Sequence, residues 1–243
     1  MASLTIKNLT KKYFGGTVAL SDISMEIEAG GTVVLLGGKD AGKTTLLKII
    51  AGLIKDYEGE IYIDGVPAKE IPIENRNIAY ATLDAMKKRK TVFETLTYPL
   101  RLRNTDCSEI AVRLNETADL TGIVDILTDR IDMLTPYLKT KVAIARAVMR
   151  TAGIYIFDSL FDCLPEDERY ELLVLMREIR RRTGGTFIFA TEESSTAFSI
   201  DGKVVLMSYG YISQIGTMKE ICGNPANKII AKLWRYNENE ESR

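Results

Sequence analysis

The sequence predicts an α/β protein with a mostly parallel sheet, and three observations point to this fold class. Short apolar segments alternate with segments of helical periodicity along the chain. VVLL at 33–36 and IYIF at 154–157 are continuous apolar runs, as expected for strands covered on both faces. The stretch 24–28 alternates between polar and apolar residues instead, which is typical of a half-buried antiparallel strand.

The individual elements follow from these patterns. We expect strands at Leu4–Leu9, Ile23–Ile27, Thr32–Leu36, Glu60–Ile63, Asn77–Ala81, Ile154–Phe157, Thr186–Ala190, Lys203–Met207 and Tyr211–Gln214. A helix is expected at Lys43–Leu53, where apolar residues recur at helical spacing. Another is expected at Glu166–Arg182, because acids open it after Pro165 and arginines close it, so the charges complement the helix dipole.

The region between these two helices differs from the rest of the chain. From about residue 84 to 150 the pattern is helical and no strand is predicted, which indicates a helical insertion into the α/β core. The last seven residues, NENEESR, are polar, and we expect them to be frayed.

Composition narrows the function classes. The chain has 243 residues, of which 46% are hydrophobic, enough for a large core. It has no apolar run near the roughly 18 residues of a membrane span and no export signal at its start. A net charge of −1 gives no argument for nucleic acid, and three scattered cysteines suit a reducing cytoplasm. The chain contains no histidine, so imidazole chemistry is excluded for the chain acting alone.

Residues 37–44, GGKDAGKT, match the phosphate-binding loop pattern G-x-x-x-x-G-K-[ST] between a predicted strand and a predicted helix. Gly37 and Gly42 let the backbone turn tightly, so that amide groups and the helix start face a polyphosphate. Lys43 would reach the β- and γ-phosphates, and Thr44 would bind Mg²⁺. The nucleotide-binding residues predicted from this motif are Gly37, Gly38, Lys39, Asp40, Ala41, Gly42, Lys43, Thr44 and Thr45.

A second metal ligand is expected at the end of another buried strand. The run IYIF stops at Asp158, and Mg-nucleotide sites commonly place an acid at a neighbouring strand end. We therefore predict that Asp158 and Thr44 hold Mg²⁺ together beside a bound nucleotide. The alternative for Asp158 is an acid that caps the turn after its strand.

Together these segments resemble the nucleotide-binding (ATPase) subunit of an ATP-binding-cassette (ABC) transporter, most closely the sugar-type importers. The likeness extends over nearly the whole chain, including the stretches GGKDAGKTTLLKIIAGL, TVFETLTYPLRLR and KTKVAIARAVMR. It implies a P-loop NTPase (RecA-like) core with an N-terminal antiparallel β subdomain and an inserted helical subdomain. The implied single domain, 1–243, has its core and β subdomain at 1–83 and 151–236, its helical subdomain at 84–150 and its frayed tail at 237–243.

The resemblance also implies partners and an adenine contact. Tyr13 matches the aromatic residue that stacks on adenine in the family. A second ABC nucleotide-binding subunit would complete a homodimer or heterodimer, and membrane permease subunits would hold the pair. The protein would then be cytoplasmic and peripheral on the inner face of the cell membrane.

The chain departs from the family at its catalytic positions. The Q-loop glutamine corresponds to Leu83, the catalytic glutamate to Ser159 and the switch histidine to Glu192. The D-loop aspartate corresponds to Pro165, and Asp40 replaces a glycine of the phosphate loop. The signature LSGGQ corresponds to LTPYL, which consists of Leu134, Thr135, Pro136, Tyr137 and Leu138.

Each departure has a physical consequence. A serine hydroxyl is no base near neutral pH, and general-base assistance is worth roughly 10²–10⁴ in rate. Glu192 puts an anion near the expected γ-phosphate, so it must swing away or weaken nucleotide binding. Thr135 can still cap a helix with Pro136 at its first position, although Pro136 has no N–H to offer a partner's nucleotide.

Asp40 is a further departure, inside the phosphate loop itself. Aspartate tolerates the left-handed backbone that glycine positions often need, while its charge would lower nucleotide affinity.

Three hypotheses follow. The first is a degenerate ABC subunit that binds Mg-ATP, hydrolyses it weakly or not at all, and acts structurally or allosterically beside a competent subunit. The second is an active importer ATPase that energises transport. The third is a non-enzymatic interaction protein that has also lost nucleotide binding.

Overall fold

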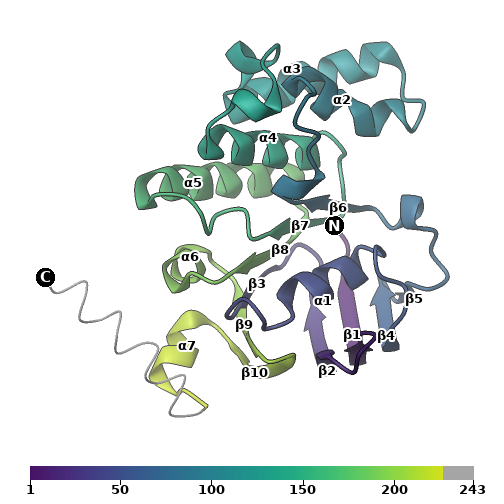
Figure 1. Cartoon of the computed structure of the whole chain (residues 1–243), viewed down its shortest axis with the longest axis vertical. Helices are drawn as coiled ribbons and strands as arrows, with labels where there is room; N and C mark the ends of the chain where they lie inside the picture. Colours follow the sequence, from purple (N-terminus) through teal and green to yellow (C-terminus); the bar gives the residue numbers. More distant parts are fainter. Residues whose placement is uncertain (227–243) are drawn as a thin grey trace, which may run out of the picture.

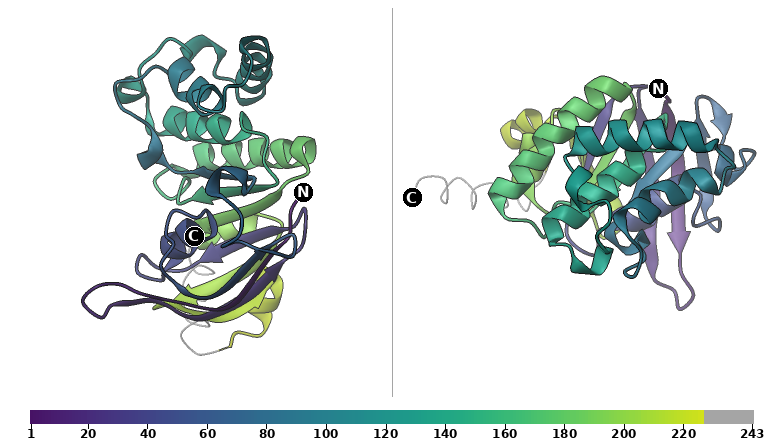
Figure 2. Two further views of the ribbon diagram at one scale, coloured as in Figure 1. Left: turned by 90° about the vertical axis from the view of Figure 1, so that its right-hand side faces the viewer. Right: turned by 90° about the horizontal axis from the view of Figure 1, so that it is seen from above.

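The computed structural model describes residues 1–226. Two sheets make up its lower part and a group of helices stands at one end (Figures 1 and 2). The predicted frayed tail, 237–243, and residues 227–236 of the predicted core lie outside the described residues.

The smaller sheet is antiparallel and lies near the N-terminus of the chain. It contains β1 (Leu4–Lys12), β2 (Val18–Ile27), β4 (Glu58–Ile63) and β5 (Val66–Pro67), in the order β2-β1-β4-β5. Along β2 the buried residues Ile23, Met25 and Ile27 alternate with exposed polar ones. The prediction of a half-buried antiparallel strand here is confirmed.

The larger sheet carries the core of the molecule. Its strands are β10 (Tyr211–Gly216), β9 (Lys203–Ser208), β3 (Thr32–Leu36), β8 (Thr186–Thr191), β7 (Ile154–Asp158) and β6 (Ile78–Ala81), in that order. All neighbours pair in parallel except β10, which pairs antiparallel with β9 at one edge. Every residue of β3, β7 and β8 is buried, as the continuous apolar runs predicted.

Two hydrophobic clusters cover the two faces of the larger sheet. Val34 and Leu36 of β3 belong to one cluster, while Val33 and Leu35 belong to the other, because successive strand residues point to opposite faces. The first cluster includes residues of α4 (Pro136–Val148) and α5 (Glu166–Thr183). The second includes α1 (Lys43–Ile50) and the antiparallel sheet.

The remaining helices complete the architecture. α2 (Val92–Arg101) and α3 (Cys107–Thr121) pack with α4 to form the helical part at the top of Figure 1. Short helices α6 (Ser194–Ser199) and α7 (Met218–Gly223) follow β8 and β10. The predicted fold class is therefore confirmed, with an antiparallel β subdomain and a helical part added to an α/β core.

The differences from prediction concern the ends of elements and a few short elements. Helix α1 ends at Ile50 rather than at residue 53, because Gly52 takes a left-handed conformation with φ of 80°. β1 and β2 extend into a hairpin around Gly15 and Gly16, so both are longer than predicted. The two-residue strand β5 is too short to leave a signal in the sequence.

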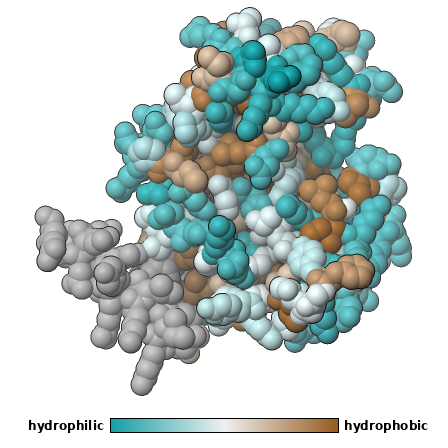
Figure 3. Space-filling view, viewed as in Figure 1, coloured by the Kyte–Doolittle hydropathy of each residue, from teal (hydrophilic) through white to brown (hydrophobic). Residues whose placement is uncertain are grey.

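The surface shown in Figure 3 is mostly hydrophilic, with apolar residues gathered in a few patches. In residues 1–226, no helix is long and apolar enough to cross a membrane. A cavity of about 750 Å³ lies at the end of the larger sheet where β3, β8 and β9 begin, with Met176, Phe187 and Arg180 in its wall. Because β3, β8 and β9 run in the same direction, the phosphate loop after β3 lies at the opposite end of the sheet.

Candidate functional site

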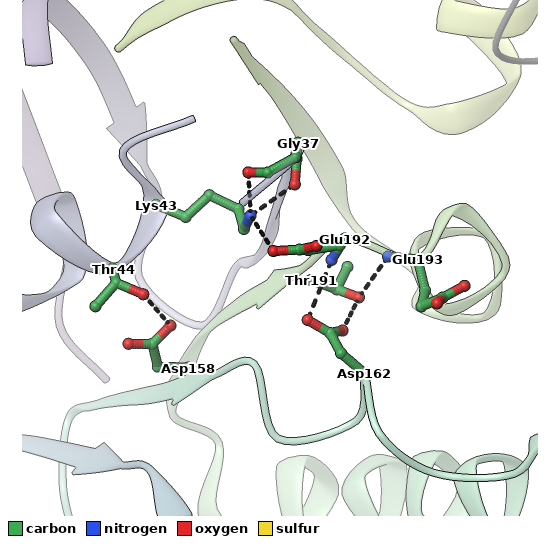
Figure 4. Close-up of polar contacts among 9 residues, drawn as sticks. Gly37, Lys43, Thr44, Asp158, Asp162, Thr191, Glu192 and Glu193 are labelled. Carbon is green, nitrogen blue, oxygen red and sulfur yellow. Dashed lines mark hydrogen bonds and ion pairs between the residues drawn. The ribbon is translucent and has the colours of Figure 1, made fainter. Parts of the chain in front are cut away.

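The predicted site residues come together where the parallel strands end. β3 leads into the loop 37–42, β7 ends at Asp158, and β8 ends just before Glu192. Because β3, β8 and β7 are adjacent and parallel, these three points lie at one edge of the sheet (Figure 4). Ligands of open α/β sheets bind at this edge.

Two glycines of the loop are required by its geometry. A Cβ atom on Gly37 would lie 2.2 Å from the carbonyl oxygen of Met207, which is backbone and cannot rotate away. Gly42 has a φ of 91° and precedes the first residue of α1, and its Cβ would lie 2.5 Å from the carbonyl oxygen of Ala19. The loop therefore turns tightly into a helix start, whose free N–H groups suit an anion.

Lys43 is buried, with its side chain only 4% exposed. Its Nζ donates to the carbonyl oxygens of Gly37 (2.6 Å) and Gly38 (2.8 Å), and it lies 3.7 Å from a carboxylate oxygen of Glu192 (Figure 4). Burial lowers the pKa of Lys43, while the charge of Glu192, and then those of Asp162 and Asp158, act in the opposite direction. Three acids thus act electrostatically on Lys43, and Glu192 is the one within 4 Å of its Nζ.

The two predicted metal ligands touch each other. Thr44 Oγ1 donates to Oδ1 of Asp158 over 2.9 Å, and the Asp158 residue is only 6% exposed. The other carboxylate oxygen accepts a hydrogen bond of 2.6 Å from the hydroxyl of Tyr80. Burial raises the pKa of Tyr80, and its hydrogen bond to Asp158 raises it further.

Asp162 organises the turn that carries Glu192. Thr191 Oγ1 donates to one carboxylate oxygen of Asp162, and the backbone N–H of Glu192 donates to the other over 3.3 Å. The backbone N–H of Glu193 donates to Thr191 Oγ1 over 3.0 Å, so the turn is held from both sides (Figure 4). Burial raises the pKa of Asp162, while the bond from Thr191 opposes that rise.

The other predicted loop residues differ in exposure. Gly38, Lys39 and Asp40 are exposed, whereas Ala41 is buried. Asp40 does not adopt a positive φ, so the tolerance of aspartate for a left-handed backbone, invoked from the sequence, is not used.

Tyr13, the predicted adenine contact, lies beside the loop. Its hydroxyl is 3.4 Å from Thr45 Oγ1, and the residue as a whole is 43% exposed. The Nζ atom of Lys11 lies 5.0 Å from the ring centroid. An exposed ring near the helix start leaves surface for an adenine, and adenine stacking stays a prediction.

The residues predicted to depart from the family's catalytic pattern lie in ordinary structural surroundings, except Ser159. Leu83 is half-buried and packs against the first hydrophobic cluster, as an apolar residue should. Ser159 has a φ of 51°, a conformation that non-glycine residues adopt infrequently, and its N–H donates to the carbonyl of Ala190. Pro165 immediately precedes the first residue of α5, where its lack of an N–H costs nothing.

The LTPYL segment begins α4 as predicted. Thr135 is the N-cap and accepts from the N–H of Leu138 over 3.3 Å, with Pro136 as the first helical residue and Leu134 buried before it. The hydroxyl of Tyr137 donates to Glu171 over 2.7 Å. Its half-buried ring packs against the first hydrophobic cluster, and its hydroxyl links the start of α4 to α5.

These residues fit a magnesium nucleotide. Within residues 1–226, no group of three or more acidic, cysteine or histidine side chains is placed to hold a metal ion alone. Mg²⁺ typically binds one or two protein oxygens and completes its shell with phosphates and water. Thr44 and Asp158 would supply the protein oxygens, and the glycine-turned loop with Lys43 would supply the phosphate contacts.

Sequence reasoning missed Tyr80 and Asp162. Tyr80 lies in an apolar strand, and only the pairing of β6 with β7 brings its hydroxyl to Asp158. Asp162 follows the β7 segment by four positions, and its partners lie after another strand. The composition of the segment DSLFD, with two acids after a buried strand, was the one available signal for Asp162.

A family model described as "ABC transporter" matches residues 20–161, which is more than half of the chain. The chain belongs to the ABC transporter family. The ABC transporter match includes the phosphate loop, the start of α4 and the end of β7.

Individual relatives agree with the ABC transporter match. The chain is 32% identical over 232 residues to UgpC of Psychromonas ingrahamii, an sn-glycerol-3-phosphate import ATP-binding protein. That match covers 95% of this chain and 62% of the relative, so the chain spans less than two thirds of that protein's length.

Solved structures with a similar fold include cbiO1 of Clostridium perfringens, part of the ABC transporter complex cbiONQ. It matches with a TM-score of 0.80 and 25% identity over 98% of both chains. A nucleotide-free ATP-binding cassette matches with a TM-score of 0.83 over 96% of this chain and 99% of the other, at 19% identity. The dimeric cassette MJ0796, bound to ADP and Pi, matches with a TM-score of 0.80 over 88% and 98%, at 22% identity. The last two likenesses show the fold alone.

Proposed function

We propose that this protein is an ATP-binding subunit of an ABC transporter that binds Mg-ATP at the loop 37–45. The main support for the proposal is that three features lie together at one edge of the sheet. These are a loop that tolerates only glycine at position 37, a buried lysine inside it, and a threonine–aspartate pair beside it. The bound nucleotide would carry the phosphate bonds whose hydrolysis releases free energy, and the residues described here would hold it and its metal.

The proposal includes partners and a location. The relative UgpC is named for import, cbiO1 for a transporter complex and MJ0796 for a dimer. We infer an importer role, pairing with a second cassette, identical or different, and attachment to permease subunits at the cytoplasmic face of the membrane. The helical part offers apolar surface for such contacts, because Tyr98 and Leu102 near the end of α2 and Met133 before α4 are exposed.

The proposal also assigns weak hydrolysis to this chain. Ser159 stands after Asp158, where the family has a carboxylate, and its hydroxyl is a poor base near neutral pH. Glu192 faces the buried lysine instead of offering a donor. In this form of the proposal the chain binds nucleotide as a structural or allosteric subunit, and a competent partner supplies most turnover.

An active ATPase is the second candidate, and one observation favours it. Asp162 carries a half-buried carboxylate in the same site, and burial raises its pKa, which is the direction that makes a carboxylate a stronger base. Membership of a family of transporter ATPases agrees with this candidate at least as well as with a degenerate role.

Nucleotide binding and phosphate release by the purified chain separate these possibilities. We expect Mg-ATP to raise the melting temperature of the wild type but not of Lys43→Ala, with phosphate release near background. Turnover of about one per second or faster, abolished by Asp162→Asn, would instead establish the active ATPase. A melting temperature that neither Mg-ATP nor Mg-ADP changes at millimolar concentration would instead support the third hypothesis, a non-enzymatic interaction protein that does not bind nucleotide.

Restoring the missing carboxylate tests the degenerate role directly. Under that role, Ser159→Glu combined with Glu192→His should increase phosphate release measurably, whereas an already active enzyme would change little. Ser159→Gln with Glu192→His is the matched control, since it has similar size without the base.

A further inference from the structure

We propose that Glu192 makes this site selective for nucleoside diphosphates over triphosphates by occupying the place of the third phosphate on Lys43. The inference rests on the proposed nucleotide site and adds a specificity-determining residue to it. It concerns the relative affinity for two ligands, and it does not depend on whether either is hydrolysed.

Most of the hydrogen-bonding capacity of the Lys43 ammonium group is already in use. An ammonium group has three N–H donors, and two of them point to the carbonyl oxygens of Gly37 and Gly38 at 2.6 and 2.8 Å. Glu192 lies 3.7 Å from the same nitrogen (Figure 4). In a phosphate loop the backbone N–H groups hold the α- and β-phosphates, whereas the γ-phosphate depends on the lysine. A third phosphate would therefore have to displace this carboxylate, and a diphosphate held by the loop N–H groups would not.

The position of Glu192 is held by its backbone. The N–H of Glu192 donates to Asp162, and Thr191 just before it is also bonded to Asp162. The next residue, Glu193, directs its carboxylate to Arg169 at 3.9 Å, away from the lysine. The turn thus presents one of two consecutive glutamates to Lys43, which makes the second glutamate a control of equal charge.

The surroundings of Lys43 carry negative charge. Glu192, Asp162 and Asp158 all act on Lys43 electrostatically, so three acids surround one lysine. Mg²⁺ at Thr44 and Asp158 would neutralise part of this charge, which leaves Glu192 and Asp162 near the terminal phosphate. Each further phosphate adds negative charge beside them, whereas a diphosphate lets Glu192 keep its place on Lys43.

Equilibrium binding of Mg-ADP and Mg-ATP by calorimetry tests the inference. We expect the wild type to bind Mg-ADP at least about tenfold more tightly than Mg-ATP, since a lost charge-assisted contact commonly changes affinity by ten- to a hundredfold. Glu192→Gln should tighten Mg-ATP by about tenfold or more and change Mg-ADP much less. Glu193→Gln should leave the ratio of the two affinities as in the wild type.

The outcomes distinguish this inference from the proposed function. Equal affinities of the wild type for both nucleotides, or a ratio that Glu192→Gln does not change, would overturn the selectivity while leaving nucleotide binding intact. If neither nucleotide binds to the wild type or to Glu192→Gln, the proposed nucleotide site itself is wrong, and the inference fails with it. Circular dichroism of both variants checks that each is folded.

Discussion

Two adjacent glycines of the phosphate loop provide the sharpest test of its geometry. In Gly37→Ala the new Cβ would lie 2.2 Å from the Met207 carbonyl oxygen and 2.9 Å from the Ala41 side chain. Ordinary contact begins at 3.4 Å, so the loop and β9 would have to separate by about 1.2 Å. In Gly38→Ala the same methyl group meets no atom within 4 Å.

The difference between these contacts gives the expected magnitudes. Because the opposing atom of Gly37 is backbone within the sheet, we expect a loss near the upper end of overpacking effects, about 3 kcal/mol. Separation would also strain the hydrogen bond from Gly37 N–H to the Thr191 carbonyl. Gly38→Ala should change the free energy of unfolding by less than about 0.5 kcal/mol, as an exposed substitution does.

Urea unfolding followed by circular dichroism measures both variants under identical conditions. The midpoint of Gly37→Ala should fall well below that of the wild type at an unchanged slope, and Mg-nucleotide binding should be lost. Gly38→Ala should unfold as the wild type does. Equal midpoints for the two variants would refute the reasoning, because the two substitutions differ only in what the methyl group meets.

Three further predictions concern α4 and the acid at the end of β7. Tyr137→Phe should lower the free energy of unfolding by about 1 kcal/mol at neutral pH, because it removes the hydrogen bond to Glu171. The pKa of Tyr137 is raised from 10.0 to about 12, so its contribution to the free energy of unfolding is complete below pH 10 and is lost as the pH rises to 12. Between pH 10 and 12, urea unfolding should show a steeper fall in the free energy of unfolding for the wild type than for Tyr137→Phe. Thr135→Ala should lower the unfolding free energy by about 1 kcal/mol through loss of the α4 cap, with Thr135→Ser close to the wild type; equal losses in both variants would contradict a capping role. Tyr80→Phe removes one of the hydrogen-bond donors to Asp158, so the carboxylate should bind Mg²⁺ more readily. In a Mg²⁺ titration at fixed ADP, the concentration that gives half of the rise in melting temperature should be lower for Tyr80→Phe than for the wild type. An unchanged concentration would show that the hydroxyl does not compete with the metal.

Local sequence signals predicted a large part of this molecule. The runs VVLL and IYIF identified buried parallel strands because both faces of those strands are covered. The phosphate loop was visible because close backbone packing demands glycine at fixed spacing. The start of α4 followed from a threonine cap and a proline at the first helical position, which act within one turn.

Contacts between distant parts of the chain were not visible in the sequence. Lys43 meets Glu192 and Asp158 meets Tyr80 only because of the strand order, which no local pattern specifies. The sequence indicated that Glu192 would place an anion near a phosphate. It did not indicate that the carboxylate faces the lysine itself, or that Asp162 fixes the turn beneath it.

The central place of β3 in its sheet has a consequence for how the protein acquires its binding site during synthesis. The loop that follows β3 is made within the first 45 residues, yet its backbone is bonded to Thr191 and Gly210. Such distant contacts close late, because long stretches of chain must first be ordered. We expect a ribosome-bound chain that ends before β9 to fail to retain nucleotide, so that retention on a nucleotide resin reports completion of the sheet.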